Sequence, residues 1–141
     1  MWFVLGVHGG AGETTLAALL PGAGAADHAW PLSPDPRRPA RVLLVARTSH
    51  AGLLAAQHAL RDWASGAVAA ELLGLVLMAD APGRLPRQLR PLADLVASAT
   101  PRIWELPWQA HWRLGQPTRQ RASRELHQLV HQLSHPQDAP L

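Results

Sequence analysis

Short apolar runs alternate with longer segments of helical periodicity along most of the chain. Four runs are apolar at consecutive positions, which is typical of strands buried on both faces of a parallel sheet. They are residues 2–7, 41–47, 71–80 and 102–108. These runs predict the strands of a central sheet.

Helical patterns follow each of these runs. A short helix is expected over 13–20, and Ser49 is a suitable N-cap for a second helix that continues to Trp63 and ends at Gly66. Pro86 and Pro91 predict a late start or a kink in the helix over 83–99, because proline cannot continue a helix interior. Two inner faces are expected: Leu53, Ala56, Leu60 and Trp63 on the second helix, and Leu126, Leu129, Val130 and Leu133 on a last helix over 117–135.

Strand and helix in alternation predict an α/β fold: a small, doubly wound, mostly parallel sheet of about four to five strands with helices on both faces. Residues 21–40 are expected to be mostly irregular, since four prolines fall between positions 31 and 39. Residues 1–135 are expected to form one domain, and residues 136–141 a flexible tail. The loops after the strands should meet at one edge of the sheet, where such folds bind ligands.

The amino-acid composition excludes some classes of site and disfavours others. The chain has 141 residues and a net charge of +3, which is only a mild bias toward nucleic acid. Zero cysteines exclude disulfides and thiolate metal sites. The first residues lack the basic region of a signal peptide, and the longest apolar run (72–79) is too short to span a bilayer, so a cytoplasmic location is expected.

The stretch GVHGGAGETTLAALL (6–20) has the composition of a phosphate-binding loop that runs into a helix. In such loops, glycines let backbone N–H groups converge on an anion, a lysine neutralises phosphate charge, and a Ser or Thr binds Mg²⁺. Here the glycines and the hydroxyl of Thr14 are present, but Glu13 stands at the lysine position, where its carboxylate is expected to lie at the mouth of the loop and to repel phosphate. A purely structural interpretation is preferred, in which the glycines serve the turn between strand and helix.

The same stretch resembles the deviant Walker A motif of ParA/MinD-type ATPases, K-G-G-x-G-K-T-T. The aligned residues follow that pattern at six of eight positions, and both lysines are replaced: His8, Gly9, Gly10, Ala11, Gly12, Glu13, Thr14 and Thr15. No apolar strand ending in Asp lies between residues 20 and 41, so a Walker B segment is absent. The chain resembles a shortened relative of the ParA/MinD-type ATPases, and is similar to a short actinobacterial group of P-loop-like proteins.

That resemblance implies roles for three further positions in the ligand crevice, which is expected at the sheet edge where the loops after the strands meet. Arg47, at the end of a strand, is the nearest substitute for the missing lysine. Asp80 stands where the family usually carries an Asn that contacts adenine, and Pro107 belongs to the loop on the base side. The signature lysine reaches across a nucleotide-sandwich dimer in that family, so its replacement by His8 weakens the case for such a dimer.

The preferred hypothesis is a degenerate P-loop domain, a pseudo-ATPase without a cofactor that acts through protein contacts, for example as an accessory to an ATPase or to mobile-element machinery. A first alternative is a weak ParA/MinD-like ATPase that binds ATP with Mg²⁺, rescued by arginines or a partner subunit in a homodimer or hetero-oligomer. A second is a nucleic-acid-binding accessory protein. Its basic surface would combine three arginine clusters: Arg37, Arg38 and Arg41; Arg84, Arg87 and Arg90; and Arg119, Arg121 and Arg124.

Two other patterns have a structural and a functional interpretation each. His127, His131 and His135 recur at helical spacing, and a solvated face is favoured over a metal site because no carboxylate completes the set. Trp108 and Trp112 lie at or beyond the end of the last strand, where core packing and a partner surface remain equally open. No nucleophile triad is visible, so an enzyme is not favoured.

Overall fold

The computed structural model describes residues 2–108 and 124–134, and its centre is a five-stranded sheet. All neighbouring strands pair in parallel, in the order β2-β1-β3-β4-β5. The expected small parallel α/β sheet is therefore confirmed. The strands are β1 (Trp2–Gly6), β2 (Ala23–Ala25), β3 (Ala40–Arg47), β4 (Ala70–Met78) and β5 (Ile103–Leu106).

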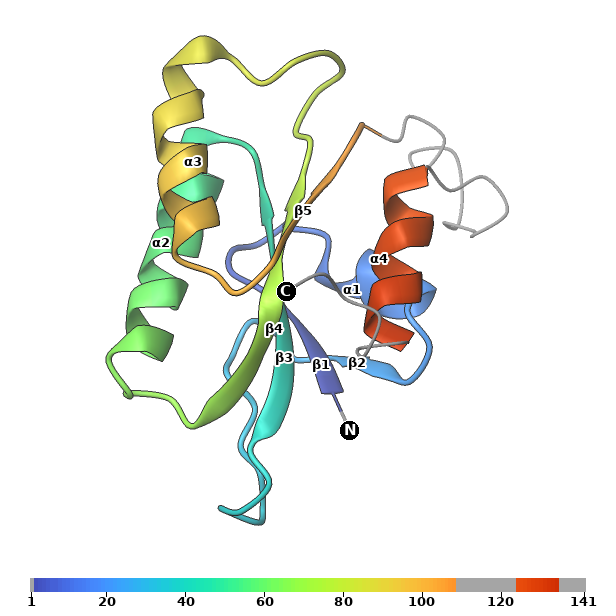
Figure 1. Ribbon diagram of the computed structural model, residues 1–141, viewed down its shortest axis with the longest axis vertical. Helices are drawn as coiled ribbons and strands as arrows, with labels where there is room; N and C mark the ends of the chain where they lie inside the picture. Colours follow the sequence, from blue (N-terminus) through green and yellow to red (C-terminus); the bar gives the residue numbers. More distant parts are fainter. Residues whose placement is uncertain (1, 109–123, 135–141) are drawn as a thin grey trace.

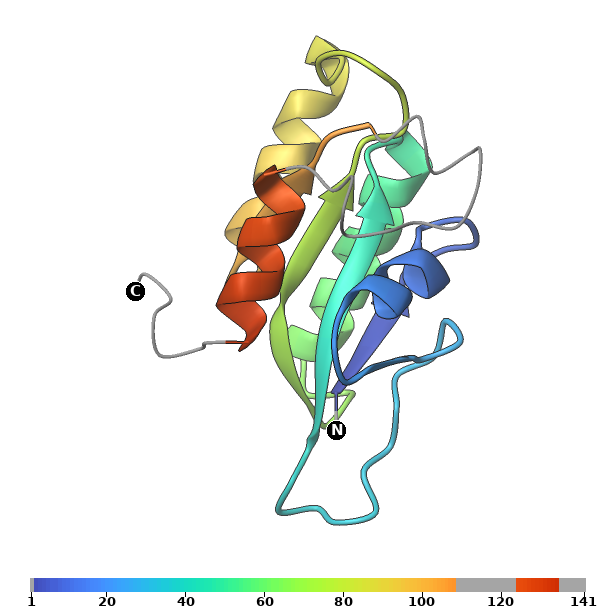
Figure 2. The ribbon, with the colours of Figure 1, turned by 90° about the vertical axis from the view of Figure 1, so that its right-hand side faces the viewer.

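Helices cover both faces of this sheet. In Figure 1 the sheet is seen nearly edge-on, with α2 and α3 on one face and α1 and α4 on the other; Figure 2 shows the second face turned toward the viewer. The elements are α1 (Glu13–Leu19), α2 (His50–Ala64), a single turn of 3₁₀ helix η1 (Arg87–Leu89), α3 (Arg90–Ser98) and α4 (Arg124–Ser134).

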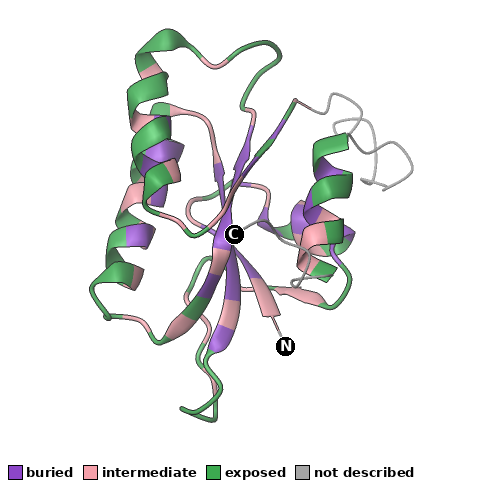
Figure 3. Ribbon diagram, in the orientation of Figure 1, coloured by how far each residue is buried: buried purple, intermediate pink, exposed green. Residues whose placement is uncertain are grey.

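Two apolar cores lie on the two faces of the sheet. Successive strand residues point to opposite faces, so Leu43 packs toward α1 and α4 while Leu44 packs toward α2 and α3. Both leucines are fully buried. Figure 3 shows the buried centre of the strands and the exposed outer faces of the helices. This double burial is why the strands are apolar at consecutive positions.

Most helix ends agree with the sequence. The Ser49 side chain accepts a hydrogen bond from the N–H of Gly52, and Gly66 adopts a positive φ of 80° just beyond α2. The predicted late start of the third helix is confirmed, because α3 begins only at Arg90 with Pro91 in its first turn. For the last helix, residues 117–123 lie outside the described residues, and Leu126 and Leu129 are buried as expected.

One strand was not expected. β2 consists of Ala23, Gly24 and Ala25, within the segment predicted to be mostly irregular, and it pairs with β1 at the edge of the sheet. Three small residues carry no hydrophobic period, so only tertiary pairing identifies them as a strand. The remainder of the 21–40 segment contains no helix or further strand before β3 begins at Ala40.

The strand order creates a switch point between β1 and β3. From β1 the chain passes through α1 to β2 on one side, and then returns to place β3 on the other side of β1. The loops that leave β1 and β3 therefore lead to helices on opposite faces. In doubly wound sheets, ligands bind at the carboxyl ends of the strands beside such a point.

Candidate functional site

The glycine loop lies at this switch point, between β1 and α1. Gly10 and Gly12 have φ values of 77° and 106°, which residues with a side chain rarely adopt. A Cβ atom on Gly12 would also lie 2.5 Å from the sulfur of Met78, at the end of β4. The turn and its packing on β4 account for these two glycines without a ligand.

The carboxylate of Glu13 is the most constrained group of the site. Its side chain is buried, with an exposed fraction of 4%, although it belongs to the first residue of α1. Oε1 accepts hydrogen bonds from the N–H groups of Gly6 and His28, both at 2.9 Å, and Oε2 accepts one from the N–H of Asp27 at 3.1 Å. We call these three bonds the Glu13 clasp.

The clasp corrects the expected position of Glu13. From the sequence, its carboxylate should face the mouth of the glycine loop and repel phosphate there. Instead it turns back under the loop, toward the end of β1 and the residues after β2. The physical reason is that hydrogen bonds to a charged acceptor contribute about 1.5–3 kcal/mol each, which offsets the loss of hydration.

Gly6, at the end of β1, is enclosed by the clasp. Its N–H donates to Glu13, and its carbonyl oxygen accepts a hydrogen bond of 2.9 Å from Nδ1 of His28. A Cβ on Gly6 would lie 3.0 Å from Cβ of Glu13 and 3.1 Å from the His28 ring. Sequence reasoning counted Gly6 among the loop glycines, but it missed Asp27 and His28 as site residues.

His8 takes the position of the signature lysine, and both of its ring nitrogens are engaged. Nδ1 donates to the carbonyl oxygen of Gly9 at 2.8 Å, and Nε2 accepts from the backbone N–H of Arg47 at 3.0 Å. The ring thus joins the loop after β1 to the end of β3. Gly52, in the first turn of α2, leaves room for this ring: a Cβ there would lie 3.0 Å from Nε2.

Arg47, the expected substitute for the missing lysine, also bonds within the protein. Its guanidinium donates to the carbonyl oxygens of Gly10 at 3.1 Å and of Ala79 at 3.3 Å. These bonds tie the glycine loop to the segment after β4. The structure therefore brings Arg47 to the loop, as expected, but directs its charge toward backbone carbonyls.

Asp80 and Pro107 lie together at a neighbouring cleft. This cleft, of about 660 Å³, opens at the carboxyl ends of β3, β4 and β5, and its lining contains none of residues 8–15. The backbone N–H of Asp80 donates to the hydroxyl of Thr48 at 3.2 Å. The crevice residues expected from the sequence are thus divided, with Arg47 on the loop and the other two in the cleft.

The cleft has a mixed lining. Leu77 and Leu106 form buried apolar parts of it, and Arg90 bonds to Glu105 at 3.0 Å at its rim. The hydrogen bond with the Glu105 carboxylate raises the pKa of Arg90 above its ordinary value. Trp108 is half-buried beside this end of β5, and Trp112 lies outside the described residues.

The remaining residues of the loop motif differ in exposure. Ala11 is buried, Thr15 is half-buried, and Thr14, which would be the Mg²⁺ ligand of a phosphate loop, is exposed. In the part of the chain that the structure describes, no group of three or more His, Cys, Asp or Glu side chains is arranged to hold a metal ion.

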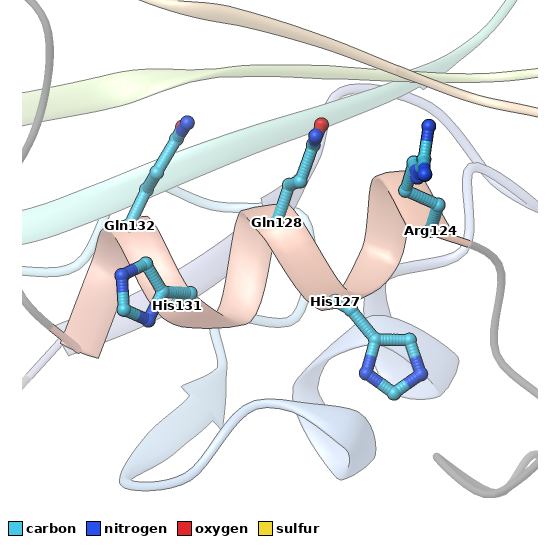
Figure 4. A pocket seen from close by; sticks show the side chains of 5 residues that line it. All are labelled: Arg124, His127, Gln128, His131 and Gln132. Atoms are coloured by element: carbon cyan, nitrogen blue, oxygen red, sulfur yellow. The ribbon is translucent and has the colours of Figure 1, made fainter.

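The histidine column of the last helix lies on its surface. His127 and His131 are exposed, and His135 lies outside the described residues. With Arg124, Gln128 and Gln132 they line a shallow hollow of about 450 Å³, in which the glutamines project to one side of α4 and the histidines to the other (Figure 4). Gln132 accepts a hydrogen bond of 2.6 Å from the indole N–H of Trp104, so one side of this hollow helps to fix α4 on β5.

The arginine clusters do not form one surface among the described residues. Arg37 and Arg38 precede β3 and lie at the amino edge of the sheet, whereas Arg84 and Arg87 follow β4 at the carboxyl edge. Two further arginines are in ion pairs: Arg41 with Glu71 at 3.7 Å, and Arg90 with Glu105 and Asp94. Arg119 and Arg121 lie outside the described residues.

Comparisons with known proteins identify the family but no relative of known activity. No curated protein and no solved structure matches the chain. Across residues 2–108 and 124–134, none of the helices is both long and apolar enough to cross a membrane. A family model covers residues 1–130, and the chain accordingly belongs to the family of unknown function DUF6668.

Proposed function

We propose that this domain is a degenerate phosphate-loop domain, a pseudo-ATPase that acts through protein contacts and neither binds nor hydrolyses nucleotide. The Glu13 clasp carries this proposal. In a working phosphate loop the residue at this position supplies a cation, whereas here it supplies a buried carboxylate that is part of the fold.

Electrostatics supports the absence of nucleotide. The Glu13 carboxylate repels an anion bound at the loop, and like charges a few ångströms apart repel by up to about 4 kcal/mol at an effective dielectric of about 20, where each ~1.4 kcal/mol weakens binding about tenfold. The attraction of the missing lysine is lost in addition. Arg47 gives little compensation, since its guanidinium is held by the carbonyls of Gly10 and Ala79. Phosphoryl transfer would suffer more, because its transition state concentrates charge on the transferred group.

The internal bonds of the loop support the same conclusion. His8 spans from Gly9 to Arg47 with both ring nitrogens, so the loop after β1 is fixed on the end of β3 without a ligand. Leu32 is 94% exposed and Leu95 is 51% exposed, but single apolar side chains of this kind are ordinary on protein surfaces. A role through protein contacts is therefore proposed from the altered chemistry of the loop.

Titration calorimetry with Mg-ATP tests this proposal. We expect no saturable heat from the wild-type protein up to about 1 mM nucleotide, which means a binding free energy weaker than about −4 kcal/mol. The matched variant is Gly10→Val, because valine does not adopt the φ of 77° that the loop has at this position. A micromolar isotherm in the wild type would overturn the proposal, and its loss in Gly10→Val would place the nucleotide on the loop.

A further inference from the structure

The three N–H groups of the Glu13 clasp come from segments far apart in the sequence. Gly6 ends β1, whereas Asp27 and His28 follow β2 and begin the connection to β3. All three groups point at one carboxylate, and both of its oxygens accept. Converging backbone N–H groups of this kind are how proteins bind small anions.

The backbone has an unusual conformation at Asp27 and His28. Their φ values are 56° and 60°, so two consecutive residues with side chains occupy the left-handed region. That region costs free energy for any residue other than glycine. Asp27 and His28 are the central residues of a tight turn, which a hydrogen bond of 3.4 Å from the N–H of Ala29 to the carbonyl oxygen of Ala26 closes. In this turn the N–H groups of both residues point toward Glu13.

We propose that Gly6, Asp27 and His28 form a backbone anion site, here called the 6/27/28 nest, and that Glu13 is its built-in ligand. The nest takes a single carboxylate, and its occupation fastens the start of the β2–β3 connection to α1. The inference deepens the proposed function, and rests on it for the view that residues 8–15 are a degenerate phosphate loop. The Glu13 carboxylate is thus the intramolecular anion that holds the start of the β2–β3 connection against α1.

The chemistry of the nest predicts which external ligand replaces Glu13. Glu13→Ala keeps Cβ and removes four heavy atoms, one methylene carbon and the carboxylate, which together have the size of acetate. In the wild type the tethered carboxylate has a high effective concentration, so external acetate does not displace it. In Glu13→Ala the nest is vacated, and acetate satisfies the three N–H groups again.

The experiment compares thermal unfolding in acetate and in chloride, at equal ionic strength and at pH 7.5. The control variant is Thr14→Ala, since Thr14 is the exposed neighbour of Glu13 on α1. We expect Glu13→Ala to melt well below both other proteins in chloride. Acetate at about ten times its Kd should raise the folding equilibrium constant of Glu13→Ala about tenfold, and leave wild type and Thr14→Ala unchanged. Equal melting of the two variants, or an equal acetate effect on all three proteins, would overturn the proposal.

Amide hydrogen exchange on the wild type keeps the proposal testable even if Glu13→Ala does not fold. We expect the amides of Asp27 and His28 to exchange about 10- to 100-fold more slowly than in an unstructured chain, although both residues are exposed. Rapid exchange at both would overturn the nest. Neither experiment uses nucleotide, so ATP binding by the wild type would end the proposed function and leave the nest intact.

Discussion

Replacing Glu13 by lysine is expected to destabilise the domain and to leave it unable to bind ATP. The substitution restores the residue that a phosphate loop requires, so the sequence alone would favour a gain of nucleotide binding. In the structure it leaves the N–H groups of Gly6, Asp27 and His28 without an acceptor and places an ammonium group beside them. Breaking a buried, hydrogen-bonded charge in this way costs about 3–5 kcal/mol.

Thermal unfolding followed by circular dichroism measures this effect. For a chain of this length, the loss corresponds to a fall in Tm of more than about 10 °C. Thr14→Lys is the control, because it introduces the same lysine side chain one residue later at an exposed position and keeps the Glu13 carboxylate; it should change stability by less than about 0.5 kcal/mol. A Glu13→Lys protein that melts like the control and binds Mg-ATP would show that the Glu13 clasp does not exist.

Gly52→Ala is expected to destabilise the domain by about 2–3 kcal/mol, a fall in Tm of roughly 6–15 °C. Glycine to alanine within a helix ordinarily stabilises by up to about 1 kcal/mol, so the expected sign is reversed. The reason is that a Cβ at this position would overlap the backbone carbonyl oxygen of Arg47 and lie 3.0 Å from Nε2 of His8. Helix α2 would have to move away from the end of β3, which disturbs the bond between His8 and the Arg47 N–H.

Gly9→Ala is the control for this substitution, since a Cβ on Gly9 has nothing within 4 Å. Its stability should stay within about 0.5 kcal/mol of wild type. Urea unfolding of both variants measures the difference. If Gly52→Ala proves as stable as Gly9→Ala, helix α2 does not pack closely against the end of β3 at Gly52.

The sequence predicted those elements whose cause is local. Consecutive apolar residues identified β3 and β4 because both faces of these strands are covered, and Ser49 located the start of α2 through its own capping bond. β2 could not be predicted, since Ala23, Gly24 and Ala25 form a strand only by pairing with β1. A pattern of residue types does not encode pairing between segments that small.

The candidate site was predictable in its loop and crevice residues, but not in the partners of Glu13 or in its hydrogen bonds. The glycine loop, Arg47 and the carboxyl edge of the sheet all follow from the strand–loop–helix pattern. The partners of Glu13 do not, because they are backbone N–H groups whose direction depends on the φ angles of Asp27 and His28. An acidic residue at the start of a helix is favourable in any case, so its presence gave no sign of a buried role.

A crystal structure of the wild-type protein grown with millimolar Mg-ATP tests the central claim most directly. We expect the Glu13 carboxylate to accept from Gly6, Asp27 and His28 as it does without nucleotide, and no triphosphate density at residues 8–15. Triphosphate density against the first turn of α1, with the Glu13 side chain displaced from these three N–H groups, would contradict the account.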